Sequence, residues 1–210
     1  MVYSILHPEL ITITDELTNS AYFGGDKSWY SRERSRRAGC GPTCAANVLS
    51  YLAFTRPKLR ALYAYDNMNL SDFAMHMEEV YKFVTPRAGG LNRVEFFSDG
   101  VADFAASRGI LLNPQVFSVS GNMTDGRPPV SEFIEFAKAG LLSDCPLGFL
   151  VLTRGREKKL QAWHWITITQ ADIEGTSAIA SASDEGINRS FDLRLWYLST
   201  RMRGGLVYFT

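Results

Sequence analysis

Apolar residues recur at helical spacing in several segments, and the clearest of these covers residues 42–54. Pro42 suits the first turn of a helix, because the N–H that proline lacks would have no partner there. The positions that repeat at i, i+3, i+4 and i+7 predict a helix with a buried face: Ala45, Val48, Leu49 and Leu52.

The same spacing predicts a second helix over residues 71–83, with Ser71 as its N-cap. The residues expected to face inward from this helix are Phe73, Met77 and Val80. Two later helices are each expected to end at the glycine that follows: residues 98–107 before Gly109, and residues 130–139 before Gly140.

Three segments follow neither a helical nor a strand period. Residues 1–38 are expected to be irregular, with a turn at 22–26. The charged run from Arg32 to Arg37 is expected to be a solvated loop. Residues 114–129 are predicted to be extended and rich in turns.

The last part of the chain has the pattern of strands. Residues 147–152 form a short apolar run between a proline and a glycine, which favours a buried strand. β-Branched and aromatic residues predict a second strand at 162–169, and a hairpin turn at 173–175 joins it to a third at 176–182. Further strand material is expected at 191–196 and 205–209.

Helices followed by strands predict an α+β fold with a mostly antiparallel sheet. A chain of 210 residues suits one domain. We expect that domain to span residues 1–210, with a helical part at about 38–140 and a sheet part at about 146–210.

Composition and charge narrow the choice of partners. The chain is 46% hydrophobic and 21% charged, and its 22 basic residues balance 22 acidic ones. This balance argues against a nucleic acid or an anionic membrane as a partner recognised by bulk charge. No run approaches the roughly 20 apolar residues that cross a bilayer.

Cysteine usage and the N-terminal residues predict a compartment. Three cysteines, an odd number, do not form a disulfide framework, so we expect free thiols in a reducing environment. The N-terminal stretch lacks a basic leader and a small-residue cleavage site, so no signal peptide is expected. A cytoplasmic protein is therefore predicted.

Cys40 is the candidate nucleophile. It lies just before the predicted helix at 42–54, where unpaired N–H groups and the helix dipole favour negative charge. A thiol at such a place has its pKa lowered toward the reactive thiolate. Gly39 and Gly41 on either side allow another backbone or a substrate to approach closely.

The other two cysteines are predicted to be packing residues. Cys44 lies one helical turn beyond Cys40 among core-facing positions, and Cys145 stands beside Pro146. Cys40 and Cys44 with a histidine could bind a metal, but the usual close ligand pair is absent and the chain has only 3 histidines. We therefore predict no metal and no cofactor.

His164 is the candidate base. A nucleophilic cysteine needs a base that holds the thiolate and later protonates the leaving group. His7 and His76 are expected to be surface or packing residues. His164 stands in the predicted strand between Trp163 and Trp165, where a period of two separates it from both tryptophans.

Asp184 is the candidate group that orients the imidazole. Folding the strand after His164 back through the turn near Gly175 brings Asp184 close to His164, give or take one residue of register. Asp172, near the turn, would be far away. Glu185 is a neighbour that this pairing leaves open.

These residues resemble those of papain-like cysteine peptidases. The stretch GCGPTCAAN at 39–47, a distant His164 that opens an apolar strand, and Asp184 at the end of the next strand follow that family's order. The chain looks most like the bacterial branch that includes the bacteriocin-leader-processing peptidases. The resemblance covers the cysteine helix and the C-terminal strands, while residues 56–145 align with nothing known.

The resemblance implies a papain-like fold and a hydrolase that cleaves a peptide or amide bond through an acyl-enzyme. It implies Cys40 as nucleophile, His164 as general acid and base, and Asp184 as the orienting group. It also implies an oxyanion hole built from the Cys40 N–H and an upstream glutamine. The sequence departs here, because Arg34 stands six residues before Cys40 and no glutamine precedes that cysteine.

Four residues are candidates for the oxyanion hole or for substrate binding. Gly41 allows close approach, Arg34 offers a substitute donor or a partner for a substrate carboxylate, and Trp163 and Trp165 form an aromatic flank. Two alternatives stay open. One is a transglutaminase-like acyl transferase with the same triad, which the aromatic flank would suit, and the other is a papain-like scaffold that binds without catalysis.

Overall fold

The structure, a computed structural model, describes residues 1–121 and 126–210. Its helices are α1 (Glu33–Ala38), α2 (Cys40–Thr55), α3 (Leu70–Tyr81), α4 (Val94–Ser107), α5 (Val130–Leu142) and α6 (Leu193–Ser199). Its strands are β1 (Val2–Ser4), β2 (Thr12–Asp15), β3 (Ser20–Phe23), β4 (Pro114–Val119), β5 (Leu147–Val151), β6 (His164–Glu174), β7 (Ser177–Asp184), β8 (Ile187–Asp192) and β9 (Gly204–Phe209). Short 3₁₀ turns are η1 (Pro8–Ile11), η2 (Lys27–Trp29) and η3 (Pro57–Leu62).

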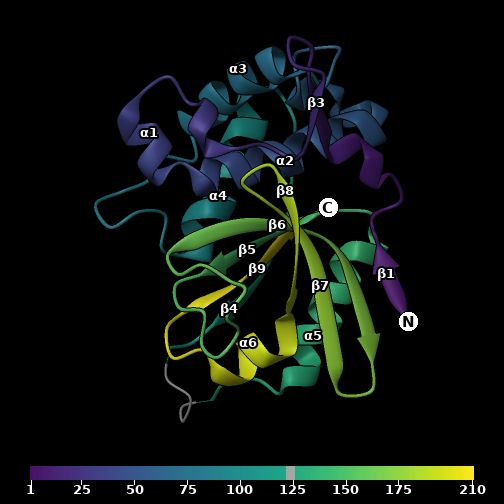
Figure 1. Ribbon diagram of the computed structural model, residues 1–210, viewed down its shortest axis with the longest axis vertical. Coiled ribbons are helices and arrows are strands. Elements are labelled where there is room, and N and C mark those ends of the chain that lie inside the picture. The colour runs from purple at the N-terminus through teal and green to yellow at the C-terminus, as the bar shows by residue number, and fades with distance from the viewer. Residues whose placement is uncertain (122–125) are drawn as a thin grey trace.

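One large sheet organises the molecule. It has 7 strands, in the order β4-β9-β5-β6-β7-β8, with β1 paired to β6 beside this path. Each of these pairs is antiparallel. Figure 1 shows α1, α2 and α3 gathered above the sheet, with α5 and α6 against its lower part. The predicted α+β class with a mostly antiparallel sheet is confirmed.

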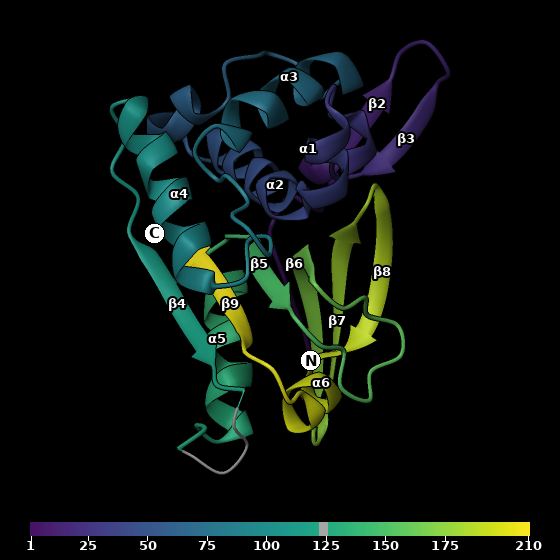
Figure 2. The ribbon, with the colours of Figure 1, turned by 90° about the vertical axis from the view of Figure 1, so that its left-hand side faces the viewer.

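The two faces of the sheet are covered by different helices (Figure 2). On one face, Gly148 of β5 has no side chain, and a Cβ there would meet the Phe97 ring of α4 at 2.9 Å. On the other face, Phe149 stacks on Phe191 and contacts Trp196 of α6. Because both faces are covered, β5 is buried throughout and reads as a continuous apolar run.

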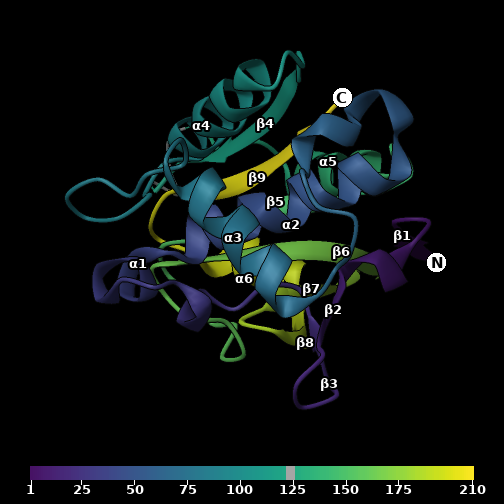
Figure 3. The same ribbon diagram turned by 90° about the horizontal axis from the view of Figure 1, so that it is seen from above.

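Helix α2 is the most buried helix of the fold. All residues from Gly41 to Ala53 are buried, and the view from above shows α2 lying over β5 and β6 (Figure 3). A mostly apolar helix that is buried on every side belongs in the middle of a core. The predicted helix is therefore confirmed, and it begins two residues earlier than expected, at Cys40.

Asn47 ties α2 to two other parts of the chain. Its Oδ1 accepts a hydrogen bond of 2.9 Å from the Gly25 N–H in the N-terminal segment. Its Nδ2 donates to Thr167 Oγ1 at 3.0 Å and to Ser183 Oγ at 3.2 Å, on β6 and β7. A single buried amide thus fixes the helix against the N-terminal segment and the β6–β7 hairpin.

The prediction that residues 1–38 are irregular is wrong. β1 pairs with the outer half of β6, and β2 and β3 form a separate two-stranded hairpin. The arginine-rich run is not a loop but lies largely in helix α1, with its arginines exposed and Ser35 buried. Arginine and glutamate are good helix formers, and Glu33 and Arg37 pair at 2.6 Å across one turn.

Two predicted helix starts are corrected. Asn69, and not Ser71, caps α3, because its side chain accepts a hydrogen bond from the Asp72 N–H. Helix α4 begins at Val94, four residues before the predicted start, and buries that residue. The inward positions predicted for α3 are confirmed as buried: Phe73, Met77 and Val80.

Gly140 does not end a helix. Helix α5 continues through it to Leu142, and a Cβ at Gly140 would lie 2.9 Å from the Tyr208 ring. The glycine therefore allows α5 to pack closely on β9. The chain reverses after the helix at Asp144, which has a positive φ of 51°.

The division into a helical part and a sheet part is also corrected. β4 lies within the predicted helical part and pairs with β9. It accounts for the first residues of the stretch predicted to be extended at 114–129, while residues 122–125 lie outside the described residues. Residues 193–196 are helical, because Asp192 ends β8 and caps α6 by accepting from the Leu195 N–H.

Within the described part of the chain, no helix combines the length and apolarity needed to span a membrane.

Replacing Asn47 with alanine is expected to lower the free energy of unfolding by about 3 kcal/mol, because it leaves buried polar groups without a partner. Asn188→Ala, at an exposed position on β8, is the matched control and should change stability by less than about 0.5 kcal/mol. Chemical denaturation of both variants measures the difference. A loss below 1 kcal/mol at Asn47 would show that the amide network is not what holds α2 in place.

Candidate active site

Cys40 is the first residue of α2, at a tight junction with α1. A Cβ on Gly39 would lie 2.4 Å from the Ser35 carbonyl oxygen, and one on Gly41 would lie 2.6 Å from Leu91. The two glycines therefore allow neighbouring segments to approach the cysteine from both sides, as the sequence predicted. Cys40 itself is half-buried, so its thiol lies at the edge of the core.

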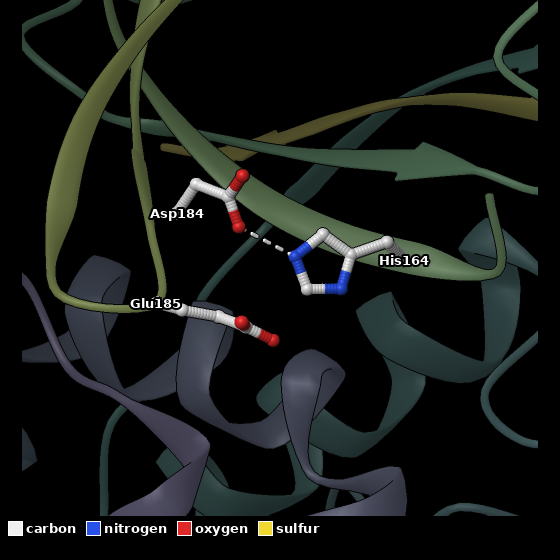
Figure 4. Close-up of side chains that lie close together, drawn as sticks. All are labelled: His164, Asp184 and Glu185. Atoms are coloured by element: carbon white, nitrogen blue, oxygen red, sulfur yellow. Dashed lines mark hydrogen bonds and ion pairs between the residues drawn. The ribbon is translucent and has the colours of Figure 1, made fainter. Parts of the chain in front are cut away.

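His164 opens β6 and contacts Asp184 directly. Its Nε2 lies 2.6 Å from Asp184 Oδ1, and both side chains are buried (Figure 4). The β6–β7 hairpin produces this contact by pairing Thr167 with Ser183, and a bulge between Ile168 and Gln170 shifts the register farther along the strands. The predicted proximity of His164 and Asp184 is confirmed.

Arg189 on β8 is a partner of Asp184 that the sequence did not reveal. Its Nε donates to Asp184 Oδ2, while His164 occupies Oδ1. Burial alone would raise the pKa of the Asp184 carboxyl, but the hydrogen bonds and charges of His164 and Arg189 outweigh it and lower that pKa. Asp184 is therefore ionised at neutral pH.

Cys40 and His164 shift each other's titration in opposite directions. Burial opposes a charge on Cys40, but a side-chain hydrogen bond with His164, the imidazolium charge and the Trp165 N–H together lower the pKa of the thiol. Burial likewise opposes a charge on His164, yet Asp184 and Cys40 raise its pKa to about 9. Both shifts favour the thiolate–imidazolium form of the pair over the neutral form.

Lys27 and Glu185 extend this set of charges. Lys27 lies in η2, forms an ion pair with Glu185, and its charge helps to lower the pKa of Cys40. Burial disfavours the ammonium, but Glu185, Cys40 and Asp184 together raise the pKa of Lys27. Figure 4 shows the Glu185 carboxylate on the helix side of the His164–Asp184 pair. Sequence reasoning missed Lys27, which lies in a segment expected to be irregular.

An apolar cavity of about 290 Å³ opens beside Cys40. Its walls include Leu91, Leu150, Leu152 and Trp163, and Arg37 stands among the lining residues. The volume is close to the lower end of the roughly 300–1,000 Å³ typical of ligand pockets. The cavity has room for one large side chain or a short acyl group next to the thiol.

The four candidate binding residues have different positions. Trp163 lines the cavity and is 55% exposed, but it precedes β6 and has a φ of +56°, so the prediction that it alternates along the strand is wrong. Trp165 is buried, stacks on Phe97 and donates from Nε1 to the Leu91 carbonyl oxygen at 2.6 Å. Arg34 is exposed on α1. Gly41 packs against Leu91 beside Cys40.

The remaining thiols are packing residues, as predicted. Cys44 donates to the Ile166 carbonyl oxygen at 3.2 Å, and burial raises its pKa to about 12. Cys145 is also fully buried, and its pKa rises to about 12 for the same reason. Neither thiol forms a thiolate at neutral pH.

Of the two other histidines, His7 is exposed and His76 is fully buried between aromatic rings. Burial lowers the pKa of His76 to about 3, which keeps it neutral. These positions match the expected surface and packing roles.

Three ligand-type side chains cluster at the site. The candidate ligand atoms of His164, Asp184 and Glu185 lie within 4.8 Å of one another. Both carboxylates are already paired with cations of the chain itself, Asp184 with Arg189 and Glu185 with Lys27. The donor set is therefore balanced by ion pairs and does not call for a metal ion.

Comparison with known proteins adds no family to this geometry. Neither protein-family models, nor curated proteins, nor solved structures give a match.

Asp184→Asn should lower the pKa of His164 from about 9 toward or below its usual 6.5, because burial would then be opposed mainly by Cys40. Nuclear magnetic resonance of the imidazole measures this titration directly. Asp172→Asn, which changes an exposed carboxylate bound to the N-terminus, is the control and should leave His164 unchanged. An unaltered His164 in Asp184→Asn would contradict the orienting contact.

Proposed function

We propose that the protein is a papain-like thiol hydrolase that cleaves a peptide or amide bond through an acyl-enzyme on Cys40. The observation that carries this proposal is the pairing of a half-buried thiol at the start of a helix with a buried imidazole that Asp184 holds. This combination is how proteins activate a sulfur nucleophile.

The chemistry follows from the charges at the site. The Cys40 thiolate attacks the carbonyl carbon, a C–S bond forms, and the π electron pair moves to oxygen. When the carbonyl re-forms, the C–N bond breaks and the leaving amine takes the proton of the His164 imidazolium. Neutral His164 then deprotonates a water molecule that attacks the thioester, and the thiolate and imidazolium are regenerated as the acid leaves.

The resemblance to papain-like peptidases supports the same reading. The order Cys40, His164, Asp184 is that of the family, with the cysteine at a helix start and the other two on adjacent strands. Hydrolysis of this kind needs no cofactor. It also suits a reducing compartment such as the cytoplasm, where free thiols persist.

The apolar cavity beside Cys40 indicates what the substrate presents to the site. Leu91, Leu150 and Leu152 offer no polar partner, so an apolar side chain near the scissile bond would be favoured there. We therefore expect a peptide or amide with a large apolar group.

Alkylation by iodoacetamide tests the nucleophile. At about pH 6.5, Cys40 should react roughly tenfold or more faster than a free model thiol, because its lowered pKa keeps more of it as thiolate. His164→Ala should slow the reaction at that pH, and the rate should recover at high pH, since only the weaker contributions of Trp165 and Lys27 then oppose the rise in the thiol's pKa that burial causes. Mass spectrometry locates the label, and Cys40→Ala is the control.

The pH dependence of hydrolysis, compared with that of alkylation, distinguishes the role of Cys40 from that of His164. Hydrolysis should rise as Cys40 ionises and fall above about pH 9, where the His164 imidazolium loses its proton, whereas alkylation should not fall. Labelling of Cys40 no faster than a free thiol would contradict the proposed mechanism. Supplying a primary amine distinguishes acyl transfer from hydrolysis. If iodoacetamide labels Cys40 but the protein cleaves no amide, a binding role without catalysis is supported.

Trp163→Ala tests the substrate cavity, because it removes an exposed wall with little effect on the core. We expect it to slow labelling by a phenylalanyl chloromethyl ketone several-fold and to leave labelling by iodoacetamide unchanged. Leu111→Ala, at another exposed apolar position, is the control. Equal effects on both reagents would mean that Trp163 supports the thiol and not the substrate.

A further inference from the structure

The proposed reaction places a negative charge on the substrate oxygen, and the chain must provide donors for it. Removing one such donor typically lowers a rate by about 10²- to 10³-fold. Cys40 begins α2, and the first N–H groups of a helix have no partner within that helix, so its backbone can supply one donor. The segment before Cys40 contains no glutamine side chain that could supply another.

Lys27 reaches the site from that segment. It lies in η2, and its charge lowers the pKa of Cys40 while Cys40 in turn favours the ammonium. Lys27 and Cys40 also line one small cavity, which brings the two side chains together. Lys27 is 28% exposed, so its ammonium is also open to a group that enters from solvent.

A small cavity adjoins the lysine and the nucleophile. It has a volume of about 10 Å³, and its walls include Lys27, Cys40, His164 and Glu185. A space of roughly 10–15 Å³ holds a single water molecule. Such a cavity has room for about one oxygen atom beside both the lysine and the nucleophile, and a cation at that place is suited to stabilise a tetrahedral oxyanion.

We propose that the Lys27 ammonium is the second oxyanion donor of this site and replaces the neutral amide that the sequence lacks. The inference rests on the proposed function. When the Cys40 thiolate attacks, the carbonyl electron pair moves to oxygen, and an N–H of Lys27 donates to that oxygen without losing its proton. When the carbonyl re-forms, the lysine is unchanged.

Glu185 is the positioning residue for this lysine. An ammonium has three N–H donors, so it can bind Glu185 and the substrate oxygen together. Glu185 follows Asp184 directly and has a φ of +51°, in the turn that ends β7. One turn of the chain thus holds both His164 and Lys27.

Two small reagents that need no substrate recognition test the proposal. p-Nitrophenyl acetate acylates a thiolate through a tetrahedral oxyanion, whereas iodoacetamide alkylates it by displacing iodide, with no oxyanion. Both rates are measured on the wild-type protein and on Lys27→Met. The pH is one at which alkylation has reached its plateau, so that the Cys40 thiol is fully ionised in both proteins. We expect the burst of p-nitrophenolate to slow by about 10²-fold while alkylation stays unchanged.

Further variants distinguish donation from a general effect of charge or folding. Lys27→Arg keeps a cationic N–H donor and should recover part of the burst rate. Glu185→Gln should give a smaller loss than Lys27→Met. Lys58→Met, at an exposed lysine, is the matched control and should match the wild-type protein in both reactions and in thermal unfolding.

Two results would overturn the role of Lys27. One is an unchanged burst in Lys27→Met, and the other is an equal loss of burst and plateau alkylation, which would show that the lysine supports only the thiol or the fold. If wild-type Cys40 neither bursts nor alkylates faster than a free thiol, the proposed hydrolase itself fails. These outcomes are distinct, because the last is seen without any change at Lys27.

Discussion

The burial of α2 against the sheet is the constraint on which the candidate site depends. The helix is buried on every side from Gly41 to Ala53, so it lies in the middle of the core. Asn47 then sets its position through hydrogen bonds to Gly25, Thr167 and Ser183. Because the helix cannot slide or rotate without breaking these contacts, its first residue, Cys40, stays next to the start of β6.

The site is built from charges that alternate in sign. Arg189 pairs with Asp184, Asp184 with His164, and His164 with Cys40. Cys40 interacts in turn with Lys27, and Lys27 pairs with Glu185. A buried charge is costly unless it is paired, and here each inner group has an opposite charge on both sides. This alternation allows a thiolate and an imidazolium to exist together where burial alone would neutralise both.

Part of the fold and of the site could be predicted from local patterns. The α2 helix, the β5 run and the β6–β7 hairpin follow from periodicity and turn residues, which act over a few positions. The hairpin also placed Asp184 beside His164, because pairing along a short turn leaves little freedom of register. The arginine-rich helix α1 and the helical residues after Asp192 were missed, because short elements depend on caps and packing more than on periodicity.

The sequence by itself determined the helix that follows Cys40, the strand that carries His164 and the turn that returns to Asp184, since each depends on neighbours in the chain. Only the tertiary structure decided that Lys27 and Arg189 join them. Lys27 reaches the thiol from a segment without a clear pattern, and Arg189 meets Asp184 from β8. Their effect is electrostatic and depends on distance in space. No spacing along the chain reveals such contacts before the sheet and α2 bring the segments together.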